Sequence, residues 1–535
     1  MIGIALLAII VPLVTVVGLR MPARIGMTVS AVVVAVAAYV AWQMPPLHIA
    51  ASAVQAVHRA LTIGLILLGA VTLLRTLQAT GAMDRIKAGF SVISADMRVQ
   101  TVLVAFAFVS LLEGVSGFGT PAIVAAPLLL VLGFRPMTAA VLALLGDTIG
   151  CTFGAVGTPL IVGLENISQY SGDLVQQVGA QVTVIDMVIG VVLPVLLVAV
   201  LVLQDGGNKG RAAWRDIMAV APWAMMVGAV YVVSAFSVIR LIGPEFAAIL
   251  SGAAALVVGM ATARRGWLVP KAVWRQAADD APKATAASHK RPAQQMSLWR
   301  AWLPYGVMIG LLLLTRSVPV VKQATQQLQL SLHDIFGVAG ISSEWPVLYS
   351  PGVVLLLAAA VAALVGGSWP SFGRAARSSV VAVIGALSAL VPTLIMVQIF
   401  SNSGLHGALP SMPVVIGQGL AQAFGEVWMS VAPVLAAIGA FIAGSATVST
   451  LTMGPVQESI ATMAGLPLVG VLALHMVGAA AGNIIAIHNV VSASTVVGLR
   501  HQEGAIIRRL IAPFAVYLGT AMAVGAVMLL WHHLR

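Results

Sequence analysis

Residues 112–159 read LEGVSGFGTPAIVAAPLLLVLGFRPMTAAVLALLGDTIGCTFGAVGTP, and this stretch decides the fold. It is apolar enough to lie at membrane depth. Yet it holds two carboxylates, Glu113 and Asp147, and clusters of Gly, Ser, Thr and Pro that interrupt helices. Lipid cannot satisfy the backbone groups that a broken helix exposes, so such breaks occur inside protein or beside a watery cavity. Ionisable groups at that depth usually mark a pathway. The stretch therefore predicts a transport site.

The composition of the 535-residue chain points to a membrane protein. Hydrophobic residues make up 60% of it and charged residues 8%, whereas a soluble domain carries about 25% charged residues. The net charge of +11 resides in loops, where basic residues set orientation and meet lipid headgroups rather than nucleic acid. The single cysteine, Cys151, excludes an internal disulfide. We find no metal-ligand spacing, nucleotide loop or catalytic signature, and expect neither a cofactor nor an enzyme.

Apolar segments of about 20 residues predict an all-α polytopic fold with about 12 full transmembrane helices. The N-terminal run Met1–Gly18 lacks a basic leader, so we interpret it as the first helix rather than a cleaved signal. Two further stretches, 98–134 and 428–465, are each long enough for one helix plus a returning half. The expected crossings lie near 3–19, 25–42, 57–78, 136–163, 184–204, 217–240, 243–262, 301–318, 350–367, 375–400, 467–497 and 510–531.

The distribution of Lys and Arg among the loops favours re-entrant hairpins for both stretches. A single crossing at 98–134 would place Lys209, Arg211 and Arg215 outside, whereas a returning segment places them inside, as basic loops prefer. The same argument for the second stretch places Arg500, Arg508 and Arg509 inside. The two hairpins then have opposite orientations, which is typical of inverted-repeat transporters. We divide the chain into an N-terminal half (1–262), a cytoplasmic linker (263–300) and a C-terminal half (301–535).

Small polar residues at both hairpin tips predict a binding site for an anion. A helix start presents unpaired N–H groups, and glycines allow close approach to a ligand. The alternative is that small residues only permit tight helix packing. The candidate substrate-binding residues are Ser116, Gly117, Phe118, Gly119, Thr120, Ser445, Thr447, Ser449 and Asn483.

Ionisable residues beside these tips predict coupling to protons. Burial disfavours the charged form of a carboxyl group, so Glu113 and Asp147 are candidates to carry a proton. His488 is a third candidate because histidine titrates near neutrality. The alternative is that these groups only tie helices together. The glycine-rich segment 146–159 could also expose carbonyl oxygens to Na⁺, so sodium coupling stays open.

The series EGVSGFGTPAIVAAPLLLVLGFRP and GDTIGCTFGAVGTPLIVG, with FIAGSATVSTLTMGPVQESIA in the C-terminal half, resembles the lactate permease family of bacterial secondary transporters. The resemblance covers essentially the whole chain. It implies uptake of small 2-hydroxymonocarboxylates such as lactate or glycolate together with protons, across the bacterial inner membrane. It also implies a fold of inverted repeats with re-entrant hairpins.

The chain departs from this family pattern at three positions. Ala446 stands where the family has an acidic residue, Asp147 where it has asparagine, and Asn483 where it has lysine. We predict a proton-coupled symporter for a small hydroxy-monocarboxylate. The alternatives are a sodium-coupled or exchange carrier for another organic anion, a channel, and an intramembrane enzyme or assembly subunit.

Overall fold

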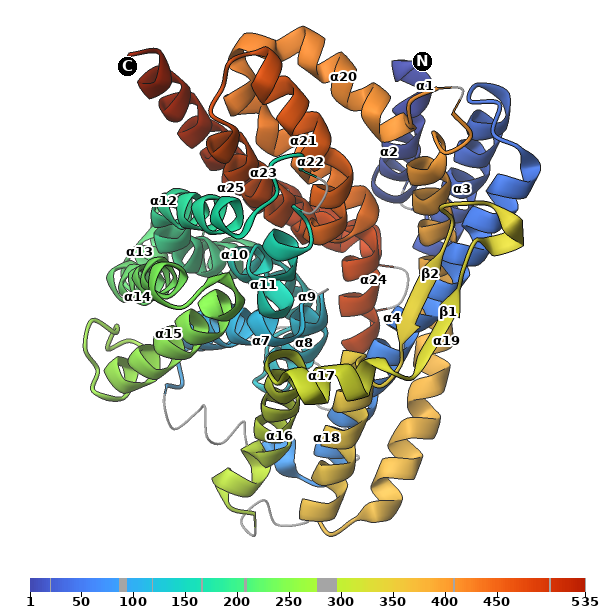
Figure 1. The fold of residues 1–535 in the computed structure, drawn as a ribbon. Helices are drawn as coiled ribbons and strands as arrows, with labels where there is room; N and C mark the ends of the chain where they lie inside the picture. The colour runs from blue at the N-terminus through green and yellow to red at the C-terminus, as the bar shows by residue number, and fades with distance from the viewer. Residues whose placement is uncertain are drawn as a thin grey trace.

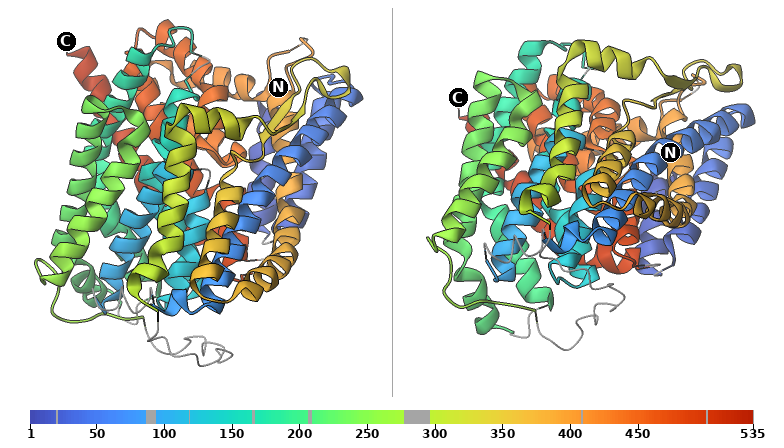
Figure 2. Two further views of the ribbon diagram at one scale, coloured as in Figure 1. Left: turned by 60° about the horizontal axis from the view of Figure 1, so that its bottom comes forward. Right: turned by 90° about the horizontal axis from the view of Figure 1, so that it is seen from below.

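The computed structural model describes all residues except Arg20, 86–93, Phe118, 165–166, 206–208, 277–295, Ala408, 500–501 and Arg535. Long helices lie side by side in it (Figure 1), and the described part contains one pair of short strands. Figure 2 shows α14 and α15 (green) at one side of the molecule and α3 and α4 (blue) at the other. These features confirm the predicted all-α polytopic membrane fold.

Helices of the N-terminal half are interrupted most often around the stretch that begins at residue 97. The elements in chain order are α1 (Ile2–Ala5), α2 (Leu7–Pro12), the π-helix η1 (Leu13–Gly18), α3 (Ala23–Val40), α4 (Pro46–Ala79), α6 (Met97–Thr101), the π-helix η2 (Val102–Phe108), α7 (Val109–Ser116), α8 (Thr120–Val131), α9 (Pro136–Gly146), α10 (Thr148–Cys151), α11 (Gly154–Ile161), α12 (Gly172–Asp205), α13 (Arg211–Met218), α14 (Ala221–Leu241), η3 (Pro244–Phe246) and α15 (Ala247–Arg264).

The C-terminal half repeats the pattern of long helices followed by interrupted ones. Its elements are α16 (Leu298–Ser317), α17 (Pro319–Gln326), β1 (Gln329–Leu332), η5 (Ile335–Gly337), β2 (Ser343–Pro346), α18 (Pro351–Val365), α19 (Trp369–Asn402), α20 (Met412–Phe424), η6 (Gly425–Val427), α21 (Trp428–Ala443), α22 (Ala446–Met463), α23 (Leu468–Ile485), α24 (Ile487–Val496) and α25 (Glu503–His533).

Seven helical segments in the described ranges are long and apolar enough to cross a membrane. Shorter apolar helices, among them α8, α18 and α21, accompany them. The expected crossing over 57–78 is instead part of α4, which extends over 34 residues. The qualifying segments are Met97–Gly114, Gly172–Asp205, Ala221–Leu241, Pro244–Arg264, Trp369–Asn402, Leu468–Ile485 and Glu503–His533.

The second hairpin consists of α21 and α22, which run antiparallel. The Ser449 hydroxyl donates to the Ala436 carbonyl at 2.8 Å, and the Gln457 amide donates to the Ala432 carbonyl at 3.0 Å. Residues later in α22 therefore contact residues earlier in α21. The chain reverses at Gly444, whose φ of 62° is readily available only to glycine.

The first hairpin is built in the same way around two glycines. Helix α7 ends at Gly117 (φ 60°), and Gly119 (φ 72°) precedes the first residue of α8. Helix α8 contacts both α7 and η2, so it folds back along the arm that leads to the tip.

Each hairpin is followed by a broken helix. The segment expected as a crossing over 136–163 divides into α9, α10 and α11, with positive φ values at Ala155 (45°) and Gly157 (74°). The segment expected over 467–497 divides into α23 and α24 at Ala486, whose ψ of 126° is extended. Both halves thus place a helix break shortly after a re-entrant tip.

The strand pair was not expected from the sequence. Strands β1 and β2 are antiparallel, with Gln329 opposite Pro346. The segment between them lies against α4 (Figure 1), because Gln55 donates to the Ser342 carbonyl at 2.7 Å. The strands are too short and polar to be recognised by alternation within a chain dominated by apolar helices.

Candidate functional site

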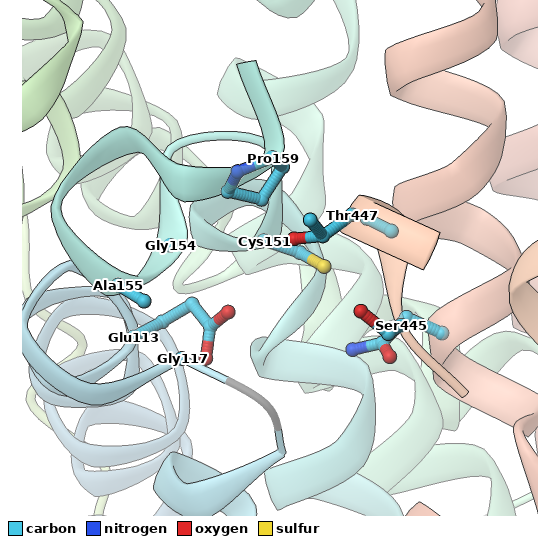
Figure 3. Close-up of a pocket in the computed structure, with 10 residues that line it drawn as sticks. Glu113, Gly117, Cys151, Gly154, Ala155, Pro159, Ser445 and Thr447 are labelled. Carbon is cyan, nitrogen blue, oxygen red and sulfur yellow. The ribbon is translucent and has the colours of Figure 1, made fainter. Parts of the chain in front are cut away.

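A small cavity lies where the two hairpin tips and the two broken helices meet. About 260 Å³ of space lies among its lining residues, part of it open to solvent. Figure 3 shows Glu113 and Gly117 on one side, and Ser445 and Thr447 across from them. Its lining residues are Glu113, Gly117, Cys151, Gly154, Ala155, Pro159, Ser445, Ala446, Thr447 and Asn483. Elements from both halves of the chain therefore build one site.

Glu113 and Asp147, the two carboxylates of residues 112–159, lie side by side at this cavity. Glu113 in α7 and Asp147, between α9 and α10, are each 2% exposed, and their carboxyl groups hydrogen-bond to each other. An ionised carboxylate only accepts hydrogen bonds, so this bond requires a proton on one of the two groups. Glu113 Oε2 and Asp147 Oδ1 are buried without a hydrogen-bond partner in the described part of the chain. The pair is therefore a buried site for at least one proton.

Glycines of the broken helix make room for this pair. A Cβ at Gly154 would lie 2.3 Å from Glu113 Oε1, and one at Gly150 would lie 3.1 Å from Glu113 Cβ. The broken helix therefore approaches the Glu113 side chain more closely than any larger residue allows.

Both hairpin tips contact the start of α24. A Cβ at Gly119 would lie 2.3 Å from Asn489 Oδ1, and a Cβ at Gly444 would lie 1.3 Å from His488 Cε1. His488 and Asn489 are neighbours in sequence and buried. The break between α23 and α24 thus positions two adjacent side chains, one against each tip.

Asn483 presents amide N–H groups at the cavity. Its Oδ1 accepts a hydrogen bond from Asn489 Nδ2 at 2.7 Å, and Asn489 Nδ2 also donates to the Asn483 carbonyl at 3.1 Å. Because the amide oxygen is occupied, the amide nitrogen of Asn483 is the group that remains to contact a ligand. A carboxylate is a suitable acceptor for it.

The start of α22 supplies further donors. Ser445 is the N-cap of this 18-residue helix, and its hydroxyl accepts from Val448 N at 3.4 Å. Ala446 and Thr447, in the first turn, also line the cavity. Unpaired N–H groups and the positive end of the helix dipole favour an anion at this place.

The predicted site residues divide into three groups. Gly117, Ser445, Thr447, Asn483 and Glu113 line the cavity, and Asp147 reaches it through its bond to Glu113. Gly119 and His488 lie instead at the contacts between the hairpin tips and α24.

Two polar residues of the hairpins are not among those that line the cavity. Ser449 ties α22 to α21, and the Thr120 hydroxyl is buried without a partner in the described ranges. Phe118 and the side chain of Ser116 lie outside the described residues.

Two further ionisable residues, His475 and Glu458, lie away from the cavity lining. His475 Nδ1 accepts from Gln457 at 3.1 Å, while Gln457 Oε1 accepts from Trp428 at 2.6 Å. Glu458 binds the backbone N–H of Ser168 at 3.0 Å and also its hydroxyl. Both residues therefore connect helices or loops rather than line the site.

Sequence reasoning missed Cys151 as a member of the site and Asp186 as a buried carboxylate elsewhere. Cys151 was considered only for disulfides, although it lines the cavity. Asp186 lies within a segment interpreted only as an apolar crossing, yet it is buried in α12. A lone carboxylate in a transmembrane segment was the available signal.

Comparisons with known proteins agree with this architecture. The family model described as L-lactate permease matches residues 2–534. A Haemophilus influenzae protein is 30% identical over 506 residues, which cover 89% of this chain and 88% of that protein. The L-lactate permease of Bacillus subtilis is 27% identical, with coverage of 89% and 86%. The glycolate permease of Escherichia coli is 31% identical over 255 residues, which cover 48% of this chain and 43% of that protein. No solved structure matches the chain. The chain belongs to the L-lactate permease family.

Proposed function

We propose that this protein is a secondary active transporter that takes up small 2-hydroxymonocarboxylates, such as lactate and glycolate, together with protons across the bacterial inner membrane. Family membership and the names of the relatives support the substrate class. The observation that carries the coupling is the buried Glu113–Asp147 pair, which shares a hydrogen bond beside a helix start suited to an anion.

Electrostatics links the two ligands. A substrate carboxylate at the start of α22 would lie across a small cavity from Glu113. If both Glu113 and Asp147 were ionised, their charges would repel it, whereas a proton on the pair removes one of these charges. Binding of the proton thus favours binding of the anion, and by linkage the anion favours the proton.

The donors of the cavity suit a hydroxy acid. The N–H groups of α22 and the Asn483 amide would bind the carboxylate, and the Thr447 hydroxyl would bind the 2-hydroxyl group. The protein would then expose this site alternately to each side by moving one bundle of helices against the other.

The test uses purified protein in sealed vesicles without a membrane potential. Addition of L-lactate or glycolate outside should make the external medium more alkaline, whereas sulfate should not. Glu113→Gln should abolish the alkalinisation. Replacing external Na⁺ with choline should leave uptake unchanged. A requirement for Na⁺ would support a sodium-coupled carrier instead, and exclusion of labelled lactate and glycolate would reject the substrate class.

A further inference from the structure

Another buried carboxylate, Asp186, lies apart from the cavity lining and from the Glu113–Asp147 pair. It occupies the middle of α12, 13 residues after Asp173 and 19 residues before Asp205. At 1.5 Å per residue, these intervals place it at least about 20 Å along the helix from either carboxylate. Its side chain is 3% exposed. Asp186 is therefore an acidic group in the apolar centre of a membrane-spanning helix.

The packing of α12 on α14 brings Asp186 toward Tyr231. A Cβ at Gly228 would lie 2.7 Å from the Gly190 carbonyl oxygen, and a Cβ at Gly179 would lie 3.6 Å from Ile239. These contacts show that the two helices run antiparallel and nearly touch. Asp186 lies one turn before Gly190 and Tyr231 one turn after Gly228, so both lie on the contacting faces and at a similar level.

Asp186 has no compensating charge. It makes no ion pair or hydrogen bond within the described residues. Two tyrosines, Tyr231 of α14 and Tyr517 of α25, lie within electrostatic range of it. Among the other titratable groups on helices packed against α12, Glu503 of α25 has a buried Oε2 without a partner in the described residues, and others are engaged elsewhere. They include His475, which contacts Gln457, and Arg98, which pairs with Asp96.

The Tyr231 hydroxyl lies between the two acidic sites. It is within electrostatic range of both Asp186 and Glu113, and it faces Ser110, one turn before Glu113 on α7. The Tyr231 and Ser110 hydroxyls face each other, and neither has another hydrogen-bond partner in the described part. A buried, unpaired carboxylate is costly unless it holds a proton. These two hydroxyls supply the intervening groups for moving that proton.

Building on the proposed function, we propose that Asp186 is a second proton-binding site, which exchanges its proton with the Glu113–Asp147 pair through the hydroxyls of Tyr231 and Ser110. In this transfer, Tyr231 accepts the proton of Asp186 while its own hydroxyl proton moves on toward Ser110 and the carboxyl pair. Each hydroxyl is restored to its neutral form, and Asp186 becomes ionised until it takes a proton from water.

The first test compares proton-driven accumulation with exchange of labelled for unlabelled lactate, which needs no net movement of protons. Asp186→Asn should lower proton-driven accumulation by about 10²-fold or more, because an amide cannot carry the proton. Exchange should stay within about twofold of the wild-type rate. Tyr231→Phe should lower accumulation by about tenfold, since it removes one hydroxyl from the path. The matched control is Asp173→Asn, an exposed carboxylate on the same helix, and it should leave both rates unchanged.

Accumulation by Asp186→Asn at the wild-type rate would overturn the proposal. Equal loss of accumulation and exchange, with Tyr231→Phe unaffected, would do so as well, because it would assign Asp186 a purely structural role.

A second measurement keeps this result separate from the proposed function. Infrared difference spectra of the reconstituted protein, recorded between two pH values without substrate, should contain a protonated-carboxyl band that Asp186→Asn lacks and Asp173→Asn retains. If the wild-type protein moves no protons with any substrate, the proposed function fails, and this band alone then tests whether Asp186 binds a proton. Loss of the band in Asp186→Asn would support proton binding at Asp186, whereas an unchanged spectrum would overturn the proposal.

Discussion

The Glu113 and Asp147 carboxyl groups hydrogen-bond to each other in the protein interior, although 34 positions separate them in the sequence (147 − 113). Each is 2% exposed, and no cation pairs with either within the described ranges. Two negative charges in this arrangement would repel each other strongly at low dielectric constant. The pair is therefore stable only when it holds a proton, and its proton content responds to any anion nearby.

Glu113→Gln should abolish proton-coupled accumulation and preserve exchange of labelled lactate. Glutamine retains the shape and can still hydrogen-bond to Asp147, but it cannot release a proton. The measurement is uptake under an imposed pH gradient beside exchange at equal pH on both sides. Glu344→Gln, an exposed carboxylate in β2, is the matched control. Accumulation in Glu113→Gln at the control rate would show that the pair does not couple transport to protons.

Asn483→Asp should raise the KM for lactate by about tenfold or more. The substitution replaces the free amide donor with a negative group, which repels the substrate carboxylate and also faces the pair at Glu113. The KM is measured by initial uptake in vesicles. The control is Gln398→Glu, which changes an amide to a carboxylate at a buried position of α19 outside the cavity lining. It shows the effect of an added buried charge away from the site. An unchanged KM in Asn483→Asp would remove this residue from the substrate site.

Gly444→Ala should destabilise the second hairpin more than a comparable substitution elsewhere. The new Cβ would lie 1.3 Å from His488, so the imidazole ring must move. Gly465→Ala is the matched control, because Gly465 has nearly the same φ (65° against 62°) but nothing within 4 Å of the new Cβ. We expect an additional loss of about 1–3 kcal/mol, typical of overpacking, measured as a lower Tm in detergent. Equal Tm values in the two variants would contradict the contact.

The clash at Gly444 can also be relieved from the other side. Combining Gly444→Ala with His488→Ala removes the ring that the new Cβ meets, so part of the lost stability should return. The double-mutant cycle measures this interaction directly. A strictly additive result would mean that His488 does not limit the space at this tip.

Arg98→Ala should destabilise the entry to the first hairpin. Arg98 pairs with Asp96 at 2.5 Å, and its guanidinium also donates to the carbonyls of Asp216 and Ala272 at 2.7 and 2.9 Å. Both partners of the pair are buried. Removing the arginine leaves Asp96 buried and unpaired, which costs about 3–5 kcal/mol. The Tm in detergent measures this loss, and the exposed Arg264→Ala is the control. A similar Tm for both variants would contradict a buried ion pair.

Sequence patterns predicted the membrane fold well because they depend on local chemistry. Glycine pairs beside apolar runs, such as Gly117 and Gly119, interrupt a helix wherever they occur. Lone carboxylates in such runs, such as Glu113, are conspicuous. The burial of Asp186 was missed because its segment was judged by mean apolarity. The Ser449 hydroxyl donates to the Ala436 carbonyl, a contact that the sequence does not reveal because a hydroxyl in a broken helix can serve either a substrate or a neighbouring carbonyl.

The sequence by itself determined that the chain lies in a membrane, where glycine and proline favour helix breaks and which groups are ionisable. Hydropathy, glycine and proline act over a few residues, so they can be read without knowing the fold. Only the tertiary structure decided that Glu113 contacts Asp147, that Asn489 orients the amide of Asn483, and that His488 packs against Gly444. These pairs depend on how distant helices cross. That crossing is fixed by close contacts between backbones at small residues, such as Gly190 with Gly228.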